Sequence, residues 1–350
     1  AKRLPVRESI IPRFLIVLMV FGFALALTGT PMSAALLACV PAALLTVVSA
    51  LKQRTLGEPL VFSDLVVVSS FLRYPRFYLG AISAPARIAI IGLIAVIGVA
   101  LFLGEALAPY ARGLGIASGL VGVVLFRAAM QYLWCCSLMT RPALTEDIQK
   151  FGLFPTLVVY ALRWRNQKDP LPALPLDELE GEQVDFVCVI QCESFMDPID
   201  LKDNRVAARM SEFARLKRTA VQSGRLLVDH FGAYTMRSEY GVLFGRDEDA
   251  LGFRQYDPYL TAKGEVTFSL ADRLKHLFTR RIFLHPHDLR FYGRDRLMPQ
   301  VGFNEVVGPE AFSSDDLCGR YVGDEALAYK ILSFMPEKEA ERVLLYAVSM

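Results

Sequence analysis

The formal net charge at pH 7 is +2, which argues neither for nor against a nucleic-acid partner, but the sequence contains no block of Lys and Arg interleaved with aromatic residues. We therefore expect no nucleic-acid partner, because such partners require a concentrated basic surface. The sequence also contains no C-x-x-C pair, which argues against a zinc ribbon or a dithiol redox motif. We interpret its cysteines as small apolar side chains. They are Cys39, Cys135, Cys136, Cys188, Cys192 and Cys318.

Hydrophobic residues make up 53% of the chain. The excess lies before residue 140, so the chain divides into a membrane part and a soluble part. Four apolar segments approach the ~20 residues that cross ~30 Å of hydrocarbon. They span residues 14–29, 33–51, 88–107 and 113–139. No small-residue cleavage site precedes a soluble domain, so we do not interpret the first segment as a signal peptide.

The number of spans, three or four, decides the topology. Arg127 lies near the middle of the fourth segment, where a charge is costly in lipid unless it snorkels or finds a partner. The amino terminus and the loop 52–87 both carry several basic residues, which favours the cytoplasmic side for each. Three spans then place the carboxyl-terminal domain outside, whereas four spans place both chain ends on one side.

Residues 140–183 are predicted to connect a membrane domain, 1–139, to a soluble domain, 184–350. Several prolines in this connection break regular structure. Residues 151–164 are amphipathic and rich in aromatics, as expected of a helix that lies on lipid or packs on the soluble domain. The chain ends inside an apolar, strand-like run at 343–348, so we expect the soluble domain to be incomplete at its carboxyl end.

From residue 184 onward the pattern alternates between apolar strands and amphipathic helices, which predicts an α/β domain with a largely parallel sheet. Strands are predicted at 184–191, 225–229, 281–284, 304–307 and 342–348, and helices at 206–222, 269–278 and 324–335. Ligands of such sheets gather at the carboxyl ends of the strands. Glu193, Thr235 and His285 each fall just after a predicted strand, so we expect them to converge on one edge.

The stretch from His230 to Tyr240 joins the predicted strand 225–229 to a predicted helix. Thr235 therefore falls at or near a helix amino terminus, where free N–H groups and the helix dipole favour an anion such as phosphate. Taken alone, Thr235 is more readily interpreted as an N-cap, because Thr commonly caps helices. Two further motifs shift the balance towards a functional role.

The motifs occur in an order that resembles one family. Residues Ile190 to Phe195 form a strand followed by Glu-Ser-Phe, and Thr235 to Tyr240 place a Thr four residues before an acidic-aromatic pair. His285 is followed by Phe291 to Asp295, similar to F-W-N-R-D, and by a Gly-aromatic pair, Gly302-Phe303. Behind a multi-span membrane half, this set resembles the lipoteichoic-acid synthase and phosphoglycerol transferase family of the alkaline phosphatase/sulfatase superfamily.

The resemblance implies a role for each matched residue. Glu193 would be a hard oxygen ligand of a divalent metal, Mn²⁺ or Mg²⁺. Thr235 would be both a metal ligand and the nucleophile, since a bound dication stabilises an alkoxide. His285, Tyr292 and Arg294 would bind the substrate. His285 would contact the phosphate or the glycerol hydroxyls or shuttle a proton, Tyr292 would wall the headgroup pocket, and Arg294 would offer its fork to phosphate oxygens.

The implied activity is transfer of a phosphoglycerol group through a covalent phospho-Thr intermediate. The donor would be a phosphatidylglycerol-type lipid, and the acceptor a cell-envelope glycan or polyol-phosphate polymer. The implied location is the bacterial plasma (inner) membrane, with a multi-pass anchor and the catalytic domain on the outer, periplasmic side. The membrane half makes sense in this arrangement, because it holds the site close to the lipid donor.

The sequence departs from the family pattern in two ways. The family completes its metal site with an Asp-His pair and a further His after a strand like 344–350, and this chain stops before them. Tyr292 and Gly293 replace the expected Trp and Asn, so the headgroup pocket and the acceptor are expected to differ. Structural roles also fit the residues singly: Glu193 as a helix cap, and Arg294 as the partner of a nearby acidic residue, Asp295 or Glu305.

Other activities remain open on the sequence. A phosphoethanolamine transferase and a hydrolase of the same superfamily would share these motifs. A true sulfatase requires a Cys or Ser within C/S-x-P-x-R, and the predicted soluble domain, 184–350, contains no such motif. A membrane sensor or scaffold that binds a polar ligand without chemistry is the non-enzymatic alternative.

Overall fold

A computed structural model of the chain forms two compact units, which we describe separately. The first unit comprises Ala1–Asp169 together with Gly252–Tyr256, and the second comprises Pro170–Leu251 and Asp257–Met350. The residues that the structure describes are 6–64, 88, 91–92, 95, 98, 109–135, 139–167, 184–193, 195, 197, 210–228, 234–246, 248–262, 264–337 and 341–350.

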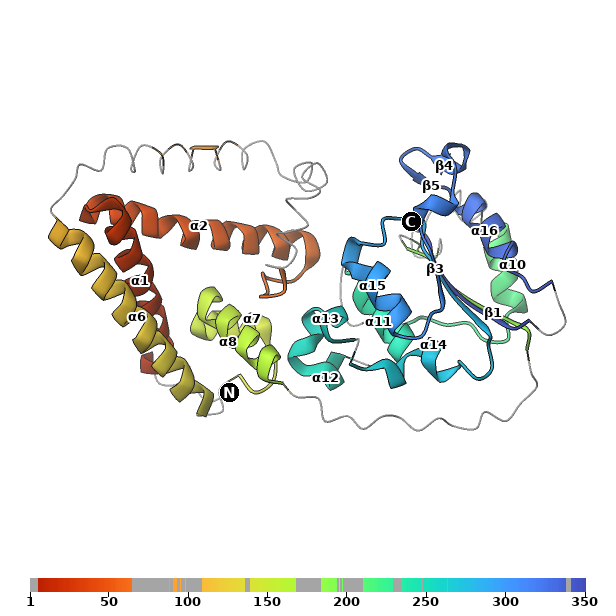
Figure 1. The fold of residues 1–350 in the computed structure, drawn as a ribbon, viewed down its shortest axis with the longest axis horizontal. Helices are drawn as coiled ribbons and strands as arrows, with labels where there is room; N and C mark the ends of the chain where they lie inside the picture. The colour runs from red at the N-terminus through yellow and green to blue at the C-terminus, as the bar shows by residue number, and fades with distance from the viewer. Residues whose placement is uncertain are drawn as a thin grey trace. The chain divides into compact units, whose positions relative to one another are not determined.

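Three helices of the first unit are long and apolar enough to cross a membrane (Figure 1). They are α1 (Val6–Thr28), α2 (Pro31–Leu56) and α6 (Pro109–Cys135). They confirm the helices predicted from the first, second and fourth apolar segments. The third predicted segment, 88–107, lies almost wholly outside the described residues.

Glycine lets α1 and α6 approach closely. A Cβ atom added at Gly115 of α6 would lie 2.4 Å from the backbone nitrogen of Ala26, and one added at Gly22 of α1 would lie 2.5 Å from the backbone nitrogen of Gly119. Real Cβ contacts are never this short, so no larger residue fits at these crossings without a shift. Small residues at such crossings are a common means of helix association in lipid.

Two shorter helices follow, α7 (Leu144–Phe151) and α8 (Leu153–Asn166), and both pack in the first unit. Arg13 of α1 donates to the carbonyl oxygens of Phe151 and Lys150 at 2.9 and 3.0 Å. These contacts satisfy carbonyls at the end of α7 that have no partner within the helix, and a cation is favourable there.

A short segment from the second half of the sequence, η2 (Gly252–Tyr256), also belongs to the first unit. Tyr160 of α8 is fully buried, with its ring 4.9 Å from that of Phe253 and 5.7 Å from that of Tyr256. Its hydroxyl donates to Asp147 at 2.6 Å. The amphipathic stretch 151–164 therefore packs against protein, which was one of its two predicted roles.

The second unit is built on a parallel four-stranded sheet in the order β1-β6-β2-β3. The strands are β1 (Phe186–Gln191), β2 (Arg280–Leu284), β3 (Glu305–Val307) and β6 (Val343–Val348). A two-stranded hairpin is formed by β4 (Leu317–Cys318) and β5 (Tyr321–Val322). This sheet confirms the predicted α/β class.

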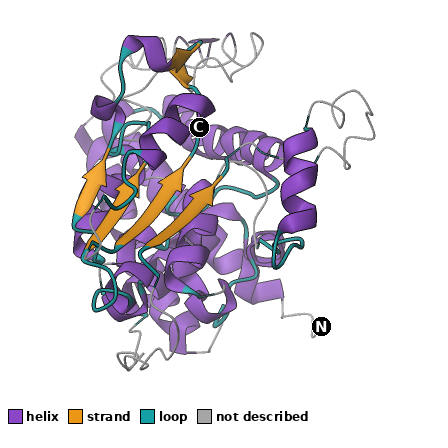
Figure 2. Ribbon diagram, turned by 90° about the vertical axis from the view of Figure 1, so that its right-hand side faces the viewer, coloured by secondary structure: helices purple, strands orange, loops and turns teal. Residues whose placement is uncertain are grey.

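Helices of the second unit lie on both faces of the sheet (Figure 2). The longer ones are α10 (Ser211–Thr219), α11 (Thr235–Phe244), α15 (Arg294–Gln300) and α16 (Asp324–Leu332). Single-turn elements are α12 (Glu248–Leu251), α13 (Tyr259–Ala262), η3 (Val266–Phe268), α14 (Leu270–Arg273), η4 (Phe291–Gly293), η5 (Pro309–Ala311) and η6 (Ser314–Asp316). All six residues of β6 are buried, as expected of a strand inside a covered sheet.

Side chains of β6 alternate between the two faces, as the pleat of a strand requires. Tyr346 and Val348 pack in one cluster with residues of α11 and α15, whereas Leu345 and Ala347 pack in another with residues of α16. The two cores fix α11 and α15 on the same side of the sheet. Their amino-terminal ends carry two of the predicted site residues, Thr235 and Arg294.

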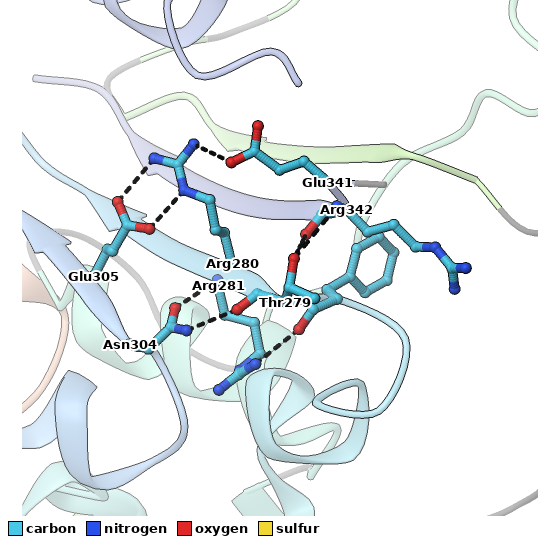
Figure 3. Close-up of polar contacts among 8 residues, drawn as sticks. Thr279, Arg280, Arg281, Asn304, Glu305, Glu341 and Arg342 are labelled. Carbon is cyan, nitrogen blue, oxygen red and sulfur yellow. Dashed lines mark hydrogen bonds and ion pairs between the residues drawn. The ribbon is translucent and has the colours of Figure 1, made fainter. Parts of the chain in front are cut away.

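Polar contacts tie together the amino-terminal edge of the sheet (Figure 3). Arg280 donates from Nε and Nη2 to the carboxylate of Glu305 at 2.7 and 2.9 Å, and from Nη1 to Glu341 at 3.0 Å. Asn304 accepts the backbone N–H of Arg281 at 2.7 Å. These contacts hold the starts of β2, β3 and β6 in register, on the edge opposite the one predicted to carry the site.

Two predicted elements differ from the structure. Arg225 to Val228 form no strand, and the side chains of Leu226 and Leu227 are 75% and 89% exposed; the rest of the predicted strand, residue 229, lies outside the described residues. The helix predicted at 269–278 is reduced to α14, followed by turns. A short apolar run indicates that the backbone favours an extended conformation. It forms a strand only where an adjacent strand completes its backbone hydrogen bonds.

Candidate active site

Two predicted site residues, Glu193 and His285, lie at the carboxyl edge of the sheet beside Ser349. Glu193 follows β1, His285 follows β2 and Ser349 follows β6. The backbone N–H of Glu193 donates to the Ser349 hydroxyl at 2.9 Å, which joins the ends of two neighbouring strands. The edge is therefore ordered by a direct contact between chain segments 156 residues apart.

Thr235 is the first residue of α11, and the cap position is occupied by Tyr234, which makes no side-chain capping bond. The N-cap interpretation of Thr235 is therefore wrong by one residue. Its hydroxyl is instead hydrogen-bonded to the side chain of Glu193. The structure thus brings the first two motifs into contact, at the positive end of a ten-residue helix.

The Glu193 carboxyl lies in a mixed electrostatic environment. Burial raises its pKa, and the nearby carboxylate of Glu239 raises it further. Arg294 and the hydrogen bond from Thr235 act in the opposite direction and lower the pKa. Burial is the largest of these effects, so the ionised form of Glu193 is only partly compensated by its protein neighbours.

Glu239 is the partner of Arg294, and the two form a buried, bidentate ion pair. Arg294 donates from Nε to Oε1 at 3.0 Å and from Nη2 to Oε2 at 2.7 Å. Their side chains are 1% and 0% exposed, and Tyr259 donates a further hydrogen bond to Glu239. Such a pair is stable only because both partners are present, since either charge alone would be buried without compensation.

Sequence reasoning included Glu239 in a motif but assigned it no role. A signal was available, because Glu239 lies four residues after Thr235 and residues at this spacing share one face of a helix. The partner itself could not be predicted, since α11 and α15 are brought together only by packing on the sheet. Arg294 pairs with Glu239 rather than with Asp295 or Glu305; Glu305 pairs with Arg280.

The pairing restricts how Arg294 can meet a phosphate. Two of its three nitrogens, Nε and Nη2, bond to Glu239, so the fork that was expected to bind phosphate faces the protein. Nη1 lies outside this pair, and the Arg294 side chain is 1% exposed. Because Glu239 holds the guanidinium in one orientation, Arg294 is a fixed rather than a mobile positive charge.

His285 is 3% exposed, and its Nδ1 lies 3.1 Å from the carbonyl oxygen of Val348. A carbonyl can only accept, so Nδ1 carries the proton and Nε2 carries a lone pair. Burial and the positive charge of Arg294 lower the His285 pKa to about 3. The ring is therefore neutral at pH 7, which suits accepting a proton from a hydroxyl better than donating to a phosphate.

Tyr292 adopts a left-handed backbone conformation, with φ of 62°, and Gly293 continues it with φ of 67°. This conformation is strained for a residue with a large side chain. It places the guanidinium carbon of Arg294 5.2 Å from the centre of the Tyr292 ring. Tyr292 and Arg294 are thus neighbours, as their shared motif led us to expect.

The donor set suits a hard divalent cation but is incomplete among the described residues. Glu193 and Thr235 offer oxygen ligands, which Mg²⁺ and Mn²⁺ prefer. Arg294 is paired with Glu239 and acts on Glu193 only through its charge, so a cation beside Glu193 would balance that carboxylate. In the part of the chain that the structure describes, no group of three His, Cys, Asp or Glu side chains could hold a metal ion.

Comparisons with known proteins agree with this architecture. Residues 185–350 match the protein-family model described as Sulfatase. The chain is 27% identical over 355 residues to the capsular polysaccharide biosynthesis protein RkpI of Rhizobium meliloti (strain 1021), across 94% of this chain and 65% of that protein. The chain thus spans about two thirds of the length of this relative. No solved structure matches this chain.

The family match describes the second half of the chain. The second half carries a sulfatase-like domain of the alkaline phosphatase/sulfatase superfamily, with a parallel sheet, behind three apolar helices. This confirms the predicted fold class. Enzymes of this superfamily generally use a divalent metal, in agreement with the oxygen donors at Glu193 and Thr235.

Proposed function

We propose that this protein is a membrane-bound phosphoglycerol transferase that acts through a covalent phospho-Thr235 intermediate. The observation that carries the proposal is the Thr235 hydroxyl, hydrogen-bonded to Glu193 at the start of α11 and one turn before the Glu239–Arg294 pair. A nucleophile, a candidate metal ligand and a fixed cation thus meet at the sheet edge where ligands of parallel α/β folds bind.

In the first step, Thr235 Oγ forms a bond to phosphorus, and the bond from phosphorus to the diacylglycerol oxygen breaks. The Thr235 proton is given up, and the leaving oxygen gains one, so diacylglycerol departs as an alcohol. In the second step, an acceptor hydroxyl attacks phosphorus and Thr235 is regenerated. A divalent cation, when bound, would lower the cost of the Thr235 alkoxide.

Other groups of the site have proposed roles in binding charge and in accepting protons. The amino terminus of α11 and Nη1 of Arg294 are suited to the charge that develops on the phosphoryl oxygens. The neutral His285 ring, with its lone pair on Nε2, is suited to accept a hydrogen bond or a proton from a glycerol or acceptor hydroxyl. Tyr292 would wall the headgroup pocket beside Arg294.

The acceptor proposed is a cell-envelope glycan or polymer. The relative RkpI is described as a capsular polysaccharide biosynthesis protein, which supports a glycan context. The three apolar helices support a membrane anchor. The proposed location is a bacterial plasma membrane, with a multi-pass anchor and the sulfatase-like domain on the outer side. This anchor would hold Thr235 close to the headgroups of the lipid donor.

Intact-protein mass spectrometry tests the proposal directly. The protein is incubated with phosphatidylglycerol and Mn²⁺, in parallel with Thr235→Ala and with Thr219→Ala, an exposed-helix control on α10. We expect a glycerophosphate adduct on the wild type and on Thr219→Ala, located in the peptide that contains Thr235. Adduct formation on Thr235→Ala would rule out this nucleophile.

The same assay separates the related activities. An adduct formed from phosphatidylethanolamine but not from phosphatidylglycerol would identify a phosphoethanolamine transferase instead. Release of free glycerol phosphate at the same rate with and without an acceptor would identify a hydrolase. Metal-independent ligand binding with no adduct from either lipid would favour the non-enzymatic alternative.

A further inference from the structure

A groove of about 470 Å³ lies beyond the carboxyl ends of β2 and β3. One side is formed by residues 286–288, which follow β2, and the other by the β4–β5 hairpin, with Pro309 and Phe312 between them. Figure 2 shows this hairpin beyond the arrowheads of the parallel strands. The groove therefore lies on the same edge of the second unit as the candidate active site, and none of that site's predicted residues lines it.

The side chains of the groove combine aromatic surface with hydrogen-bonding groups. Tyr321 is 46% exposed on the hairpin, and Phe312 adds a second ring. Ser313, Ser314 and Arg320 also line it. Aromatic faces pack against the C–H faces of sugar rings, while hydroxyl and charged groups bond to the ring substituents.

Asp288 is held in place at the rim of the groove. Arg290 donates to its two carboxylate oxygens, from Nε at 2.9 Å and from Nη2 at 2.7 Å. The backbone N–H of Arg290 also donates to Asp288 at 3.0 Å. A carboxylate fixed in this way is a preorganised acceptor for the hydroxyls of a polyol, a role for which a mobile side chain would lose more entropy.

A row of rings connects the groove to the proposed transfer site. His287 lines the groove, and its ring lies 6.0 Å from that of His285 and 5.8 Å from that of Phe291. The Phe291 ring lies 4.3 Å from that of Tyr292, which in turn borders Arg294. A molecule seated in the groove therefore lies next to the residues that are proposed to bind the phosphoglycerol group.

We infer that this groove is the acceptor subsite and that it binds sugar residues of a glycan through Tyr321, Phe312 and Asp288. The inference rests on the proposed function and adds the chemical class and location of the acceptor. Binding there would place the sugar beside His287, whose ring lies 6.0 Å from that of His285. The His285 ring is suited to accept the proton of the acceptor hydroxyl as the phosphoryl group is transferred. The step balances, because the hydroxyl proton replaces the one that Thr235 gave up.

Saturation-transfer NMR tests the binding without requiring catalysis. The probe is the oligosaccharide mixture released by mild acid from the envelope polysaccharide of the native host, added to the full chain in detergent. We expect saturation transfer to sugar-ring protons with the wild type and with Tyr321→Phe, which keeps the ring. Tyr321→Ala should bind about tenfold more weakly, the usual loss when an anchoring aromatic is truncated.

Tyr329→Ala is the matched control, because Tyr329 is 66% exposed on α16 and does not line the groove. It should bind like the wild type. No saturation transfer with the wild type, or equal binding by Tyr321→Ala and Tyr329→Ala, would overturn the inference. Thermal unfolding of each variant shows whether a loss of binding reflects a loss of folding.

The adduct assay separates failure of the inference from failure of the proposed function. Formation of the Thr235 adduct without saccharide binding would leave the transferase and remove the acceptor groove. Saccharide binding without any adduct would leave a glycan-binding groove and remove the transfer chemistry. Tyr329→Ala should form the adduct as the wild type does, since Tyr329 does not line the groove.

Discussion

Glu239 and Thr235 lie one turn apart on α11 and are engaged by different partners. Thr235 is hydrogen-bonded to Glu193, which follows β1, whereas Glu239 holds Arg294 at the start of α15. A single helix face therefore links the proposed nucleophile to the fixed cation. Any change in the Glu239–Arg294 pair is therefore expected to alter both the stability of the second unit and the position of Thr235.

Glu239→Gln should strongly destabilise the second unit. It removes the charge that compensates the buried Arg294 guanidinium, and breaking a buried ion pair from one side typically costs about 3–5 kcal/mol. Glu212→Gln is the control, because Glu212 is 76% exposed in its pair with Arg215 and such pairs contribute ~1 kcal/mol or less. Denaturant unfolding measures both; similar losses for the two variants would contradict the assigned importance of the buried pair.

His285 should remain neutral in the folded protein across the physiological range. Its pKa is lowered to about 3, whereas an unfolded chain binds a proton near pH ~6.5. Between these values the unfolded state holds the extra proton, so the free energy of unfolding contributed by His285 increases with pH and levels off above ~6.5. The ring C2–H resonance, assigned by its loss in His285→Asn, should not move between about pH 5 and 8; a titration midpoint near neutrality would refute this.

The contacts of Arg280 should make stability sensitive to acid. Arg280 lowers the pKa of Glu305 below its ordinary value, so this stabilisation is present above the unfolded Glu pKa and is lost as pH falls through the folded one. Glu305 is about one third exposed, and the gain is therefore limited to about 1 kcal/mol by solvent screening.

Comparison of Arg280→Met with the wild type tests this effect together with the loss of the Arg280–Glu341 pair. The difference between their unfolding temperatures should be present at pH 7 and shrink as the pH falls below the ordinary Glu pKa of ~4.3. It should also decrease in high salt. Lys275→Met, which removes an exposed pair with Asp272, should show little difference at either pH. A difference for Arg280→Met that does not depend on pH would assign its effect to packing instead.

Gly115→Ala should disrupt the packing of α1 on α6. The new Cβ would lie 2.4 Å from the Ala26 nitrogen, so the helices must separate and lose contacts along their crossing. Gly113→Ala is the matched control, because a Cβ there meets nothing within 4 Å, and Ala favours a helix over Gly by about 1 kcal/mol. In detergent, we expect a lower unfolding temperature for Gly115→Ala and an equal or higher one for Gly113→Ala. The reverse order would show that α1 and α6 do not pack closely at Gly115.

The local patterns of the sequence determined the elements of the fold. Long apolar runs predicted α1, α2 and α6, because only a helix satisfies its own backbone in lipid. Short apolar strands alternating with helices predicted the parallel sheet. Once the sheet is parallel, the carboxyl ends of its strands share an edge, so the positions of Glu193 and His285 could be predicted from where the strands end.

The tertiary structure decided which residues meet. The run at 225–228 has the composition of a strand but forms none, because composition does not supply a neighbour. The segment η2 packs with Tyr160 through ring contacts between residues more than ninety positions apart, which no local pattern reports. Glu239 became the partner of Arg294 because α11 and α15 pack on the same face of the sheet. Pairing across that distance depends on packing, and packing is a property of the whole chain rather than of any stretch within it.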